Sequence, residues 1–133
     1  MTSCTTGQPV GELGNLARRL FALEAWWRPE SVVSIREALA EAAALPERQA
    51  RAQEALRAAE DVRARLTPDS TRTTQALWRE EQAAVTRLRN EVVRLRQEEM
   101  ALLTVLEVEL WWARTAKWRC GVAVLNAQER DAG

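Results

Sequence analysis

The chain has 133 residues, the length of one ordinary domain, and it is 47% hydrophobic and 29% charged, with 19 acidic and 19 basic side chains. The chain has enough apolar residues to form a core, so its composition excludes the class of proteins that are disordered because they lack such residues. The zero net charge also weighs against nucleic-acid partners, whose binding depends largely on basic groups that neutralise phosphates.

The first two helices are predicted from apolar spacing and from a proline. After a flexible N-terminal tail at residues 1–10, a helix over about 11–27 carries apolar residues at alternating steps of three and four, which places them on one face. Pro29 then favours the start of a second helix, over about 30–45, because a proline in the first turn forfeits no internal hydrogen bond. The face of the first helix consists of Leu13, Leu16, Leu20, Leu23 and Trp27.

Pro46 predicts that the second helix breaks or kinks at Leu45, because a proline inside a helix removes a hydrogen bond and crowds the preceding turn. A third short helix is therefore expected over about 47–66. Thr67 and Pro68 then have the residue types of an N-cap and a first-turn proline, which mark the start of another helix. The small apolar face of the third helix, which would let a neighbouring helix approach closely, consists of Ala52, Ala55, Ala59, Val62 and Leu66.

The last predicted helix runs over about 68–128 and leaves a C-terminal tail at 129–133. Its roughly 60 residues would form a rod of about 90 Å, which the three shorter helices cannot cover over its whole length. Its first half keeps a heptad spacing, with Glu81, Glu99 and Glu109 as polar exceptions. The heptad positions are Val85, Leu88, Val92, Leu95, Leu102 and Leu106.

The second half of this helix carries another apolar stripe, displaced by about one residue, or roughly 100° around the axis. We expect the helix to change the side that it buries, and the apolar segment between Met100 and Trp112 to form the centre of the bundle or of an oligomer. The fold class predicted is all-α: a helical bundle with coiled-coil character, three shorter helices and one long C-terminal helix, in a single domain over 11–128. The second stripe consists of Val108, Trp111, Thr115, Trp118, Val122 and Leu125.

The six tryptophans occur beside one phenylalanine and no tyrosine, and five of them fall into two groups, leaving Trp78 alone. Adjacent residues of a helix point about 100° apart, so one narrow seam cannot serve both members of a pair. Either the tryptophans all fill a core, or one of each pair anchors a partner, as large aromatic residues often do at interfaces. Trp26 and Trp112 are the preferred outward-facing candidates. The two groups are Trp26 with Trp27, and Trp111 with Trp112 and Trp118.

Catalytic chemistry finds little support in the sequence. Histidine is absent, which removes the usual general base, histidine-activated nucleophiles and most catalytic zinc sites. Glu37 and Glu41 share a helix face, but helical di-iron sites also require Glu-x-x-His motifs. Cys4 and Cys120 form no CxxC motif, and the glycines near the chain ends form no phosphate-binding loop. We expect no enzyme, no metal, no cofactor and no small-molecule substrate.

One segment is locally basic, because Arg114, Lys117 and Arg119 interleave with tryptophans and no acid lies between 111 and 120. Such a segment could stack on and neutralise single-stranded nucleic acid, or lie on an anionic membrane surface as an amphipathic helix. The favoured interpretation is plainer: arginine stems flank a tryptophan face in a contact between helices.

The sequence therefore predicts a non-enzymatic interaction or scaffold subunit of a larger assembly, whose partners are other helical chains in a homo- or hetero-oligomer. The alternative is a nucleic-acid or anionic-membrane-surface binder that uses residues 111–125. No secretory signal or transmembrane segment is recognised, so we expect an intracellular protein, cytoplasmic or nuclear. The predicted partner-binding residues are Trp26, Trp27, Leu102, Leu106, Trp111, Trp112, Trp118 and Val122.

Overall fold

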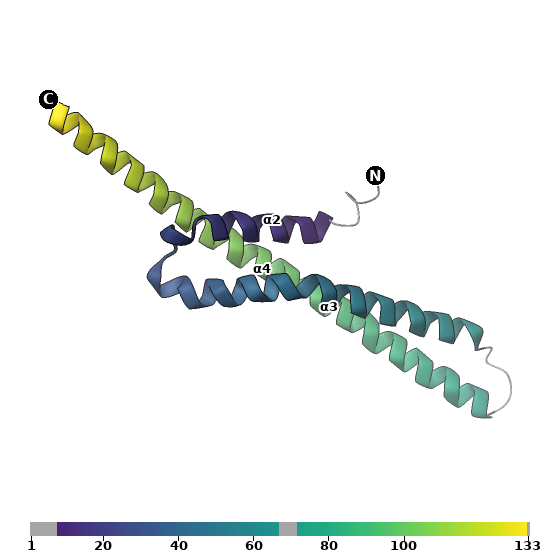
Figure 1. Ribbon diagram of the computed structural model, residues 1–133. Helices are drawn as coiled ribbons and strands as arrows, with labels where there is room; N and C mark the ends of the chain where they lie inside the picture. Colours follow the sequence, from purple (N-terminus) through teal and green to yellow (C-terminus); the bar gives the residue numbers. More distant parts are fainter. Residues whose placement is uncertain (1–7, 67–71, 133) are drawn as a thin grey trace. The chain divides into compact units, whose positions relative to one another are not determined.

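A computed structural model describes the backbone of residues 8–66 and 72–132 and the side chains of 11–66 and 73–130. The all-α prediction is confirmed, because these residues form helices joined by short turns and contain no strand. In chain order the elements, shown in Figure 1, are α2 (Gln8–Ala22), the 3₁₀ turns η1 (Glu24–Trp26) and η2 (Pro29–Ser31), α3 (Val32–Arg65) and α4 (Arg72–Ala132).

The chain divides into two compact units. Of the described residues, 8–43 and 100–132 form unit 1, and 44–66 and 72–99 form unit 2. The helices α3 and α4 each contribute one part to either unit. The single domain over 11–128 stays a prediction.

Unit 1 is a bundle of three helical segments: α2, the first part of α3 and the second half of α4. Each segment turns one apolar stripe inward, as heptad-like spacing requires. Leu102 and Leu106 lie in this core, so one side of the predicted apolar centre between Met100 and Trp112 is buried within the chain, whereas Met100 and Val105 are exposed. The buried apolar residues of the unit are Leu13, Leu20, Trp27, Ile35, Ala38, Ala42, Leu102, Leu103, Leu106, Leu110 and Ala113.

The connection between α2 and α3 departs from the predicted helix over 11–27. The helix ends at Ala22, and the chain turns through η1 before Trp27 folds back. The carbonyl of Leu20, at the end of the helix, accepts a hydrogen bond of 3.0 Å from the amide of Leu23 and a second, buried one of 2.8 Å from the indole Nε1 of Trp27. Arg28 is extended (φ −63°, ψ 131°), as expected of a residue before proline, and Pro29 opens the turn that leads into α3.

Unit 2 is a hairpin of two antiparallel helices, the last part of α3 and the first part of α4. Polar contacts between them join Arg48 to Glu98 and Glu60 to Arg89, so residue numbers fall along one helix as they rise along the other. Gln49 donates a hydrogen bond of 2.8 Å to the buried carboxylate of Glu99. The buried residues of the unit are Leu45, Ala52, Val85, Leu95 and Glu99.

Of the predicted break or kink at Leu45, the break is wrong, because α3 runs without interruption from Val32 to Arg65 with Pro46 inside it. The proline costs the helix about 3 kcal/mol. Buried side chains on both sides of the proline keep one heptad spacing, which a break would put out of register. The described residues therefore contain three α-helices instead of four. The positions that keep the spacing are Ile35, Ala38, Ala42, Leu45, Gln49 and Ala52.

The ends of the chain also differ from the predicted tails where the structure describes them. Residues 8–10 belong to α2, and α4 continues past residue 128 to Ala132. Residues 1–7 of the predicted N-terminal tail lie outside the described residues, and so do Thr67 and Pro68, the predicted start of the last helix.

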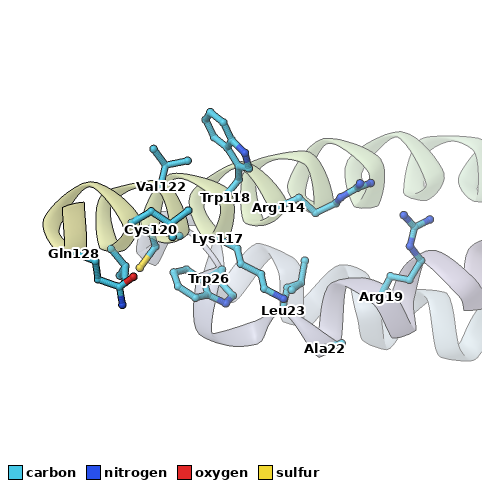
Figure 2. A pocket seen from close by; sticks show the side chains of 13 residues that line it. Arg19, Ala22, Leu23, Trp26, Arg114, Lys117, Trp118, Cys120, Val122 and Gln128 are labelled. Carbon is cyan, nitrogen blue, oxygen red and sulfur yellow. The ribbon is translucent and has the colours of Figure 1, made fainter. Parts of the chain in front are cut away.

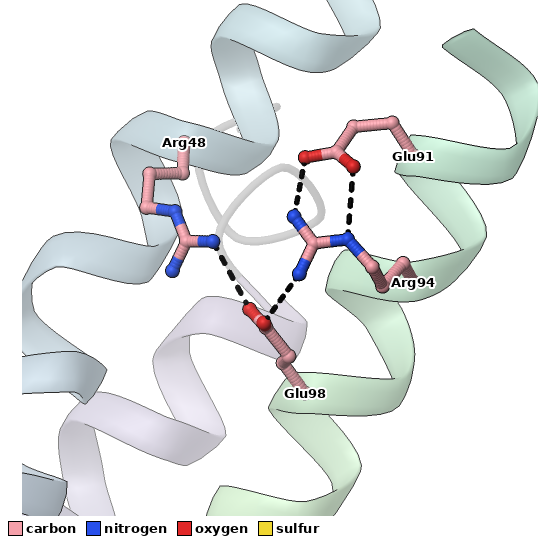
Figure 3. Close-up of polar contacts among 4 residues, drawn as sticks. All are labelled: Arg48, Glu91, Arg94 and Glu98. Carbon is pink, nitrogen blue, oxygen red and sulfur yellow. Dashed lines mark hydrogen bonds and ion pairs between the residues drawn. The ribbon is translucent and has the colours of Figure 1, made fainter. Parts of the chain in front are cut away.

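A polar network links the two helices of unit 2 (Figure 3). Arg94 donates hydrogen bonds of 2.9 and 2.6 Å to the two carboxylate oxygens of Glu91 and one of 2.7 Å to Glu98. Glu98 also pairs with Arg48 of α3 at 3.3 Å. The hydrogen bonds from Arg94 lower the pKa of Glu91 below its usual range, and the charges of Arg94 and Arg48 lower it further. The same contacts raise the pKa of Arg94, with the hydrogen bond to Glu91 as the main cause.

We expect the carboxyl of Glu91 to titrate at a lower pH than it does in the unfolded chain, measured by NMR of the side-chain carbons. Because its folded pKa is the lower one, its contribution to stability is present above the unfolded pKa and is lost as pH falls through the folded pKa. The contribution is small, because the pair is exposed and screened by water. In Arg94→Met the titration of Glu91 should move up towards its unfolded value. An unchanged titration curve in that variant would contradict the assigned cause.

Candidate partner-binding surface

An apolar row lies along the C-terminal part of α4 and is left open to solvent. We call it the C-terminal stripe. Its residues recur at alternating steps of three and four, so they share one face of the helix. The large members are 48% (Val108), 57% (Trp111), 67% (Trp118) and 59% (Leu125) exposed. Thr115 and Val122, which complete the stripe, are half-buried.

The predicted switch of the buried side is therefore wrong for the described chain. In unit 1, α4 continues to bury the face that holds Leu106, Leu110 and Ala113, while Trp111 and Trp118 point to solvent. The reason is geometric: the other two helices of unit 1 cover one side of α4, and the stripe lies on average roughly 140° around the axis from that side.

Trp112 is the inward member of its pair, which corrects the preference for Trp112 as the outward one. The guanidinium carbon of Arg28 lies 4.6 Å from the centroid of the Trp112 ring, and the same guanidinium pairs with Glu109 at 2.8 Å. Such a cation above an aromatic face is held by the ring quadrupole. Trp111 meets Trp112 edge to face, with centroids 4.9 Å apart and an interplanar angle of 81°. The exposed member of the pair is therefore Trp111.

The other tryptophans occupy three different environments. Trp27 is buried, and its ring meets Phe21 edge to face at 6.4 Å between centroids. Trp26 is half-buried and is therefore more exposed than Trp27, in agreement with the prediction that Trp26 is the outward-facing member of this pair. Trp78, in the first part of α4, is also half-buried. Of the predicted partner residues, Trp27, Leu102 and Leu106 thus belong to the core of unit 1.

A groove within unit 1 separates the C-terminal end of α2 and the following turn from the C-terminal part of α4 (Figure 2). Its volume is about 1190 Å³, and Leu23 and Trp26 form one wall. Trp118 and Val122 of the C-terminal stripe line the opposite wall. Figure 2 shows Lys117 pointing from α4 towards Leu23. The stripe and the groove therefore form one continuous surface.

The basic residues of the predicted anionic-ligand segment are all exposed. Arg114 and Lys117 line the groove together with Arg19, and no acidic residue lines it. Arg119 points elsewhere on the exposed surface of α4 and does not line the groove. Cys120 is an exposed free thiol among the described residues, whereas Cys4 lies outside them.

The three glutamates predicted as polar exceptions of the heptad have distinct places. Glu99 is buried and bonded to Gln49, and Glu109 is half-buried and paired with Arg28. Glu81 is half-buried. Sequence analysis missed Arg28 and Gln49, whose partners lie 81 and 50 residues away along the chain. No local pattern signals contacts of that sequence separation.

In residues 8–66 and 72–132, no group of three histidine, cysteine or acidic side chains is arranged to hold a metal ion. No helix in these ranges has the length and apolar character needed to cross a membrane.

Comparisons of the chain with protein-family models, curated proteins and solved structures found no match. The C-terminal stripe exposes four large apolar side chains beside an open groove, on a helix that buries another face in unit 1 as far as Ala113.

Proposed function

We propose that this protein acts without catalysis, by binding other helical chains as an interaction or scaffold subunit of a larger assembly. The observation that carries the proposal is the exposure of four large apolar side chains at heptad spacing on one face of α4. Heptad spacing is the pattern by which one helix recognises another. The predicted contact residues that remain on the surface are Trp26, Trp111, Trp118 and Val122.

Burial of the C-terminal stripe by a partner helix would be favourable in free energy. A tryptophan side chain offers about 150–250 Å² of surface, and Trp111 and Trp118 each expose more than half of theirs. At about 25 cal/mol per Å² of apolar surface, burying each would contribute roughly 2–4 kcal/mol. Contiguous apolar patches are uncommon on monomeric proteins and usually mark interaction sites.

A site-specific photo-crosslinker tests the proposal. Benzoylphenylalanine in place of Trp118 should give discrete covalent adducts in cells of the source organism, and mass spectrometry should map them to a helical segment of a protein chain. The matched control places the same amino acid at Ala127, an exposed position on the opposite side of α4. Absence of adducts from position 118, or the same adducts from both positions, would contradict the proposal.

A second function has one observation in its favour: the groove carries three basic side chains and no acidic one (Arg19, Arg114 and Lys117). Together with Trp118 they offer stacking and phosphate neutralisation, the chemistry of single-stranded nucleic acid or of an anionic membrane surface. Binding of a labelled oligonucleotide or of phosphatidylserine vesicles at low salt, lost when Arg114, Lys117 and Arg119 are replaced by glutamine, would favour this function. A wild-type chain that binds neither probe excludes it.

A further inference from the structure

The C-terminal stripe alternates between small and large side chains. Its first positions are β-branched, and its second positions are large. In a parallel pair of such helices, equal positions face each other, so each tryptophan would meet its own copy and Thr115 would meet Thr115. In an antiparallel pair, each first position faces a second position, and large residues meet small ones. The first positions are Val108, Thr115 and Val122, and the second are Trp111, Trp118 and Leu125.

One antiparallel register uses the whole stripe. When residue 108 of one helix faces 125 of the other, 111 faces 122 and 115 faces 118, so all six residues find a partner within the same six. This arrangement is self-complementary, as a two-fold symmetric contact between identical chains requires. Its axis passes between residues 116 and 117.

The residues flanking the stripe decide between the two orientations. In a parallel pair of helices, a residue on one flank meets the residue five positions later on the other flank. Arg114 would then face Arg119 of the second chain, twice in each dimer, and like charges repel at such positions. In the antiparallel register, Arg114 faces Gly121, Glu107 faces Gln128 and Arg119 faces Trp112. No like charges oppose each other there.

The groove supports the same register. Val122, which faces Trp111 of the second chain, lines the groove, and so does Leu125 beside it. The opposite wall, formed by Leu23 and Trp26, is apolar. The groove volume of about 1190 Å³ leaves room for an incoming indole ring.

The area is sufficient for a specific contact. From the exposed fractions of its side chains, the stripe offers roughly 500 Å² per chain, hence about 1,000 Å² between two copies before the flanking residues are counted. Specific interfaces begin at about 1,000–1,200 Å² of total buried surface. The expected dimer is therefore reversible and depends on concentration.

We infer that the C-terminal stripe binds a second copy of this chain, with the two α4 helices antiparallel and the symmetry axis between Ala116 and Lys117. The inference rests on the proposed function and names the partner that the stripe itself fits. It requires no other chain and gives the protein a way to link two copies of unit 1.

The first test is the mass of the purified full chain in solution, measured by light scattering over a concentration series. We expect the mass to rise from that of one chain to that of two. Trp118→Glu should stay monomeric while its far-ultraviolet circular dichroism is unchanged, because Trp118 is exposed in the single chain. Ala127→Glu, on the opposite side of α4, should dimerise as the wild type does. A wild-type chain that stays monomeric throughout the series would overturn the inference.

The second test measures orientation by disulfide formation, in a background where Cys4 and Cys120 are replaced by serine. Each single variant, Val108→Cys or Leu125→Cys, should form little disulfide-linked dimer alone. A mixture of the two variants should form it efficiently, because residue 108 of one chain faces residue 125 of the other. A parallel pair predicts the reverse, with efficient linkage of each variant alone. Linkage of the single variants would therefore overturn the antiparallel arrangement.

The two proposals fail in different ways. If the purified chain is monomeric and a crosslinker at position 118 captures a different, identified protein, the proposed function stands and the second copy is not the partner. If the chain is monomeric and position 118 captures nothing, both fail. If the chain dimerises but its stripe variants dimerise equally well, a different surface joins the copies and the inference fails.

Discussion

Replacing Leu106 by Asp should unfold unit 1, so that its cooperative unfolding transition is no longer observed. Leu106 is 0% exposed, and its neighbours along the same face, Leu102 and Leu110, are also buried. Truncating such a leucine to alanine costs about 2–5 kcal/mol, and placing an unpaired carboxylate in the same space adds several kcal/mol. Because small domains are stable by only about 5–15 kcal/mol, we expect most of the helical signal to be lost at 25 °C, as measured by far-ultraviolet circular dichroism.

The matched control is Val105→Asp, which places the same residue one position earlier on the same helix. Val105 is exposed, so its replacement should change the free energy of unfolding by less than about 1 kcal/mol. Comparable losses in the two variants would show that Leu106 is not in the core. A stable, fully helical Leu106→Asp chain would show the same.

The helices and most of the core could be predicted from the sequence, because a helix that buries one face has apolar residues at regular spacing along the chain. Leu13 and Leu20 of α2, and Val85 and Leu95 of α4, were placed on buried faces by spacing alone, and all four are buried. The failure at Pro46 has a physical reason. A local rule on proline was given more weight than the apolar register that continues on both sides of it, and burial on both sides outweighs the local cost of about 3 kcal/mol.

The candidate surface was only half predictable. Spacing identified the C-terminal stripe correctly as one face of a helix, but spacing does not say whether a face is covered. Coverage depends on where α2 ends and on which side of α4 it lies, and the end of α2 is accompanied by a hydrogen bond between Trp27 and Leu20, seven residues apart. The roles of Trp111 and Trp112 were exchanged for the same reason. Arg28, which covers Trp112, is brought to it by the turn between α2 and α3.

Trp27→Ala should destabilise the folded chain by about 3–5 kcal/mol, the usual cost of removing a buried tryptophan. Trp27 is 7% exposed, and its indole donates a hydrogen bond to the carbonyl of Leu20, which also accepts from the amide of Leu23. Trp27→Phe keeps most of the volume but removes the indole donor, and the loss of one hydrogen bond to a carbonyl that keeps another partner costs about 0.5–1.5 kcal/mol. In urea unfolding followed by circular dichroism, the free energy of unfolding should therefore fall more in Trp27→Ala than in Trp27→Phe, relative to the wild type.

Trp111→Ala is the contrasting variant, because it removes the same side chain from an exposed position. At concentrations low enough to keep the chain monomeric, its free energy of unfolding should fall by only about 0.5–1.5 kcal/mol, because the edge-to-face contact with Trp112 is lost. At high concentration it should lose the additional stability that association gives to the wild type, since binding to the folded state raises apparent stability by mass action. Equal losses for Trp27→Ala and Trp111→Ala in the monomer would mean that both tryptophans are core residues. The assignment of Trp111 to the contact surface of α4 would then be wrong, because that assignment requires Trp111 to contribute more to association than to the fold.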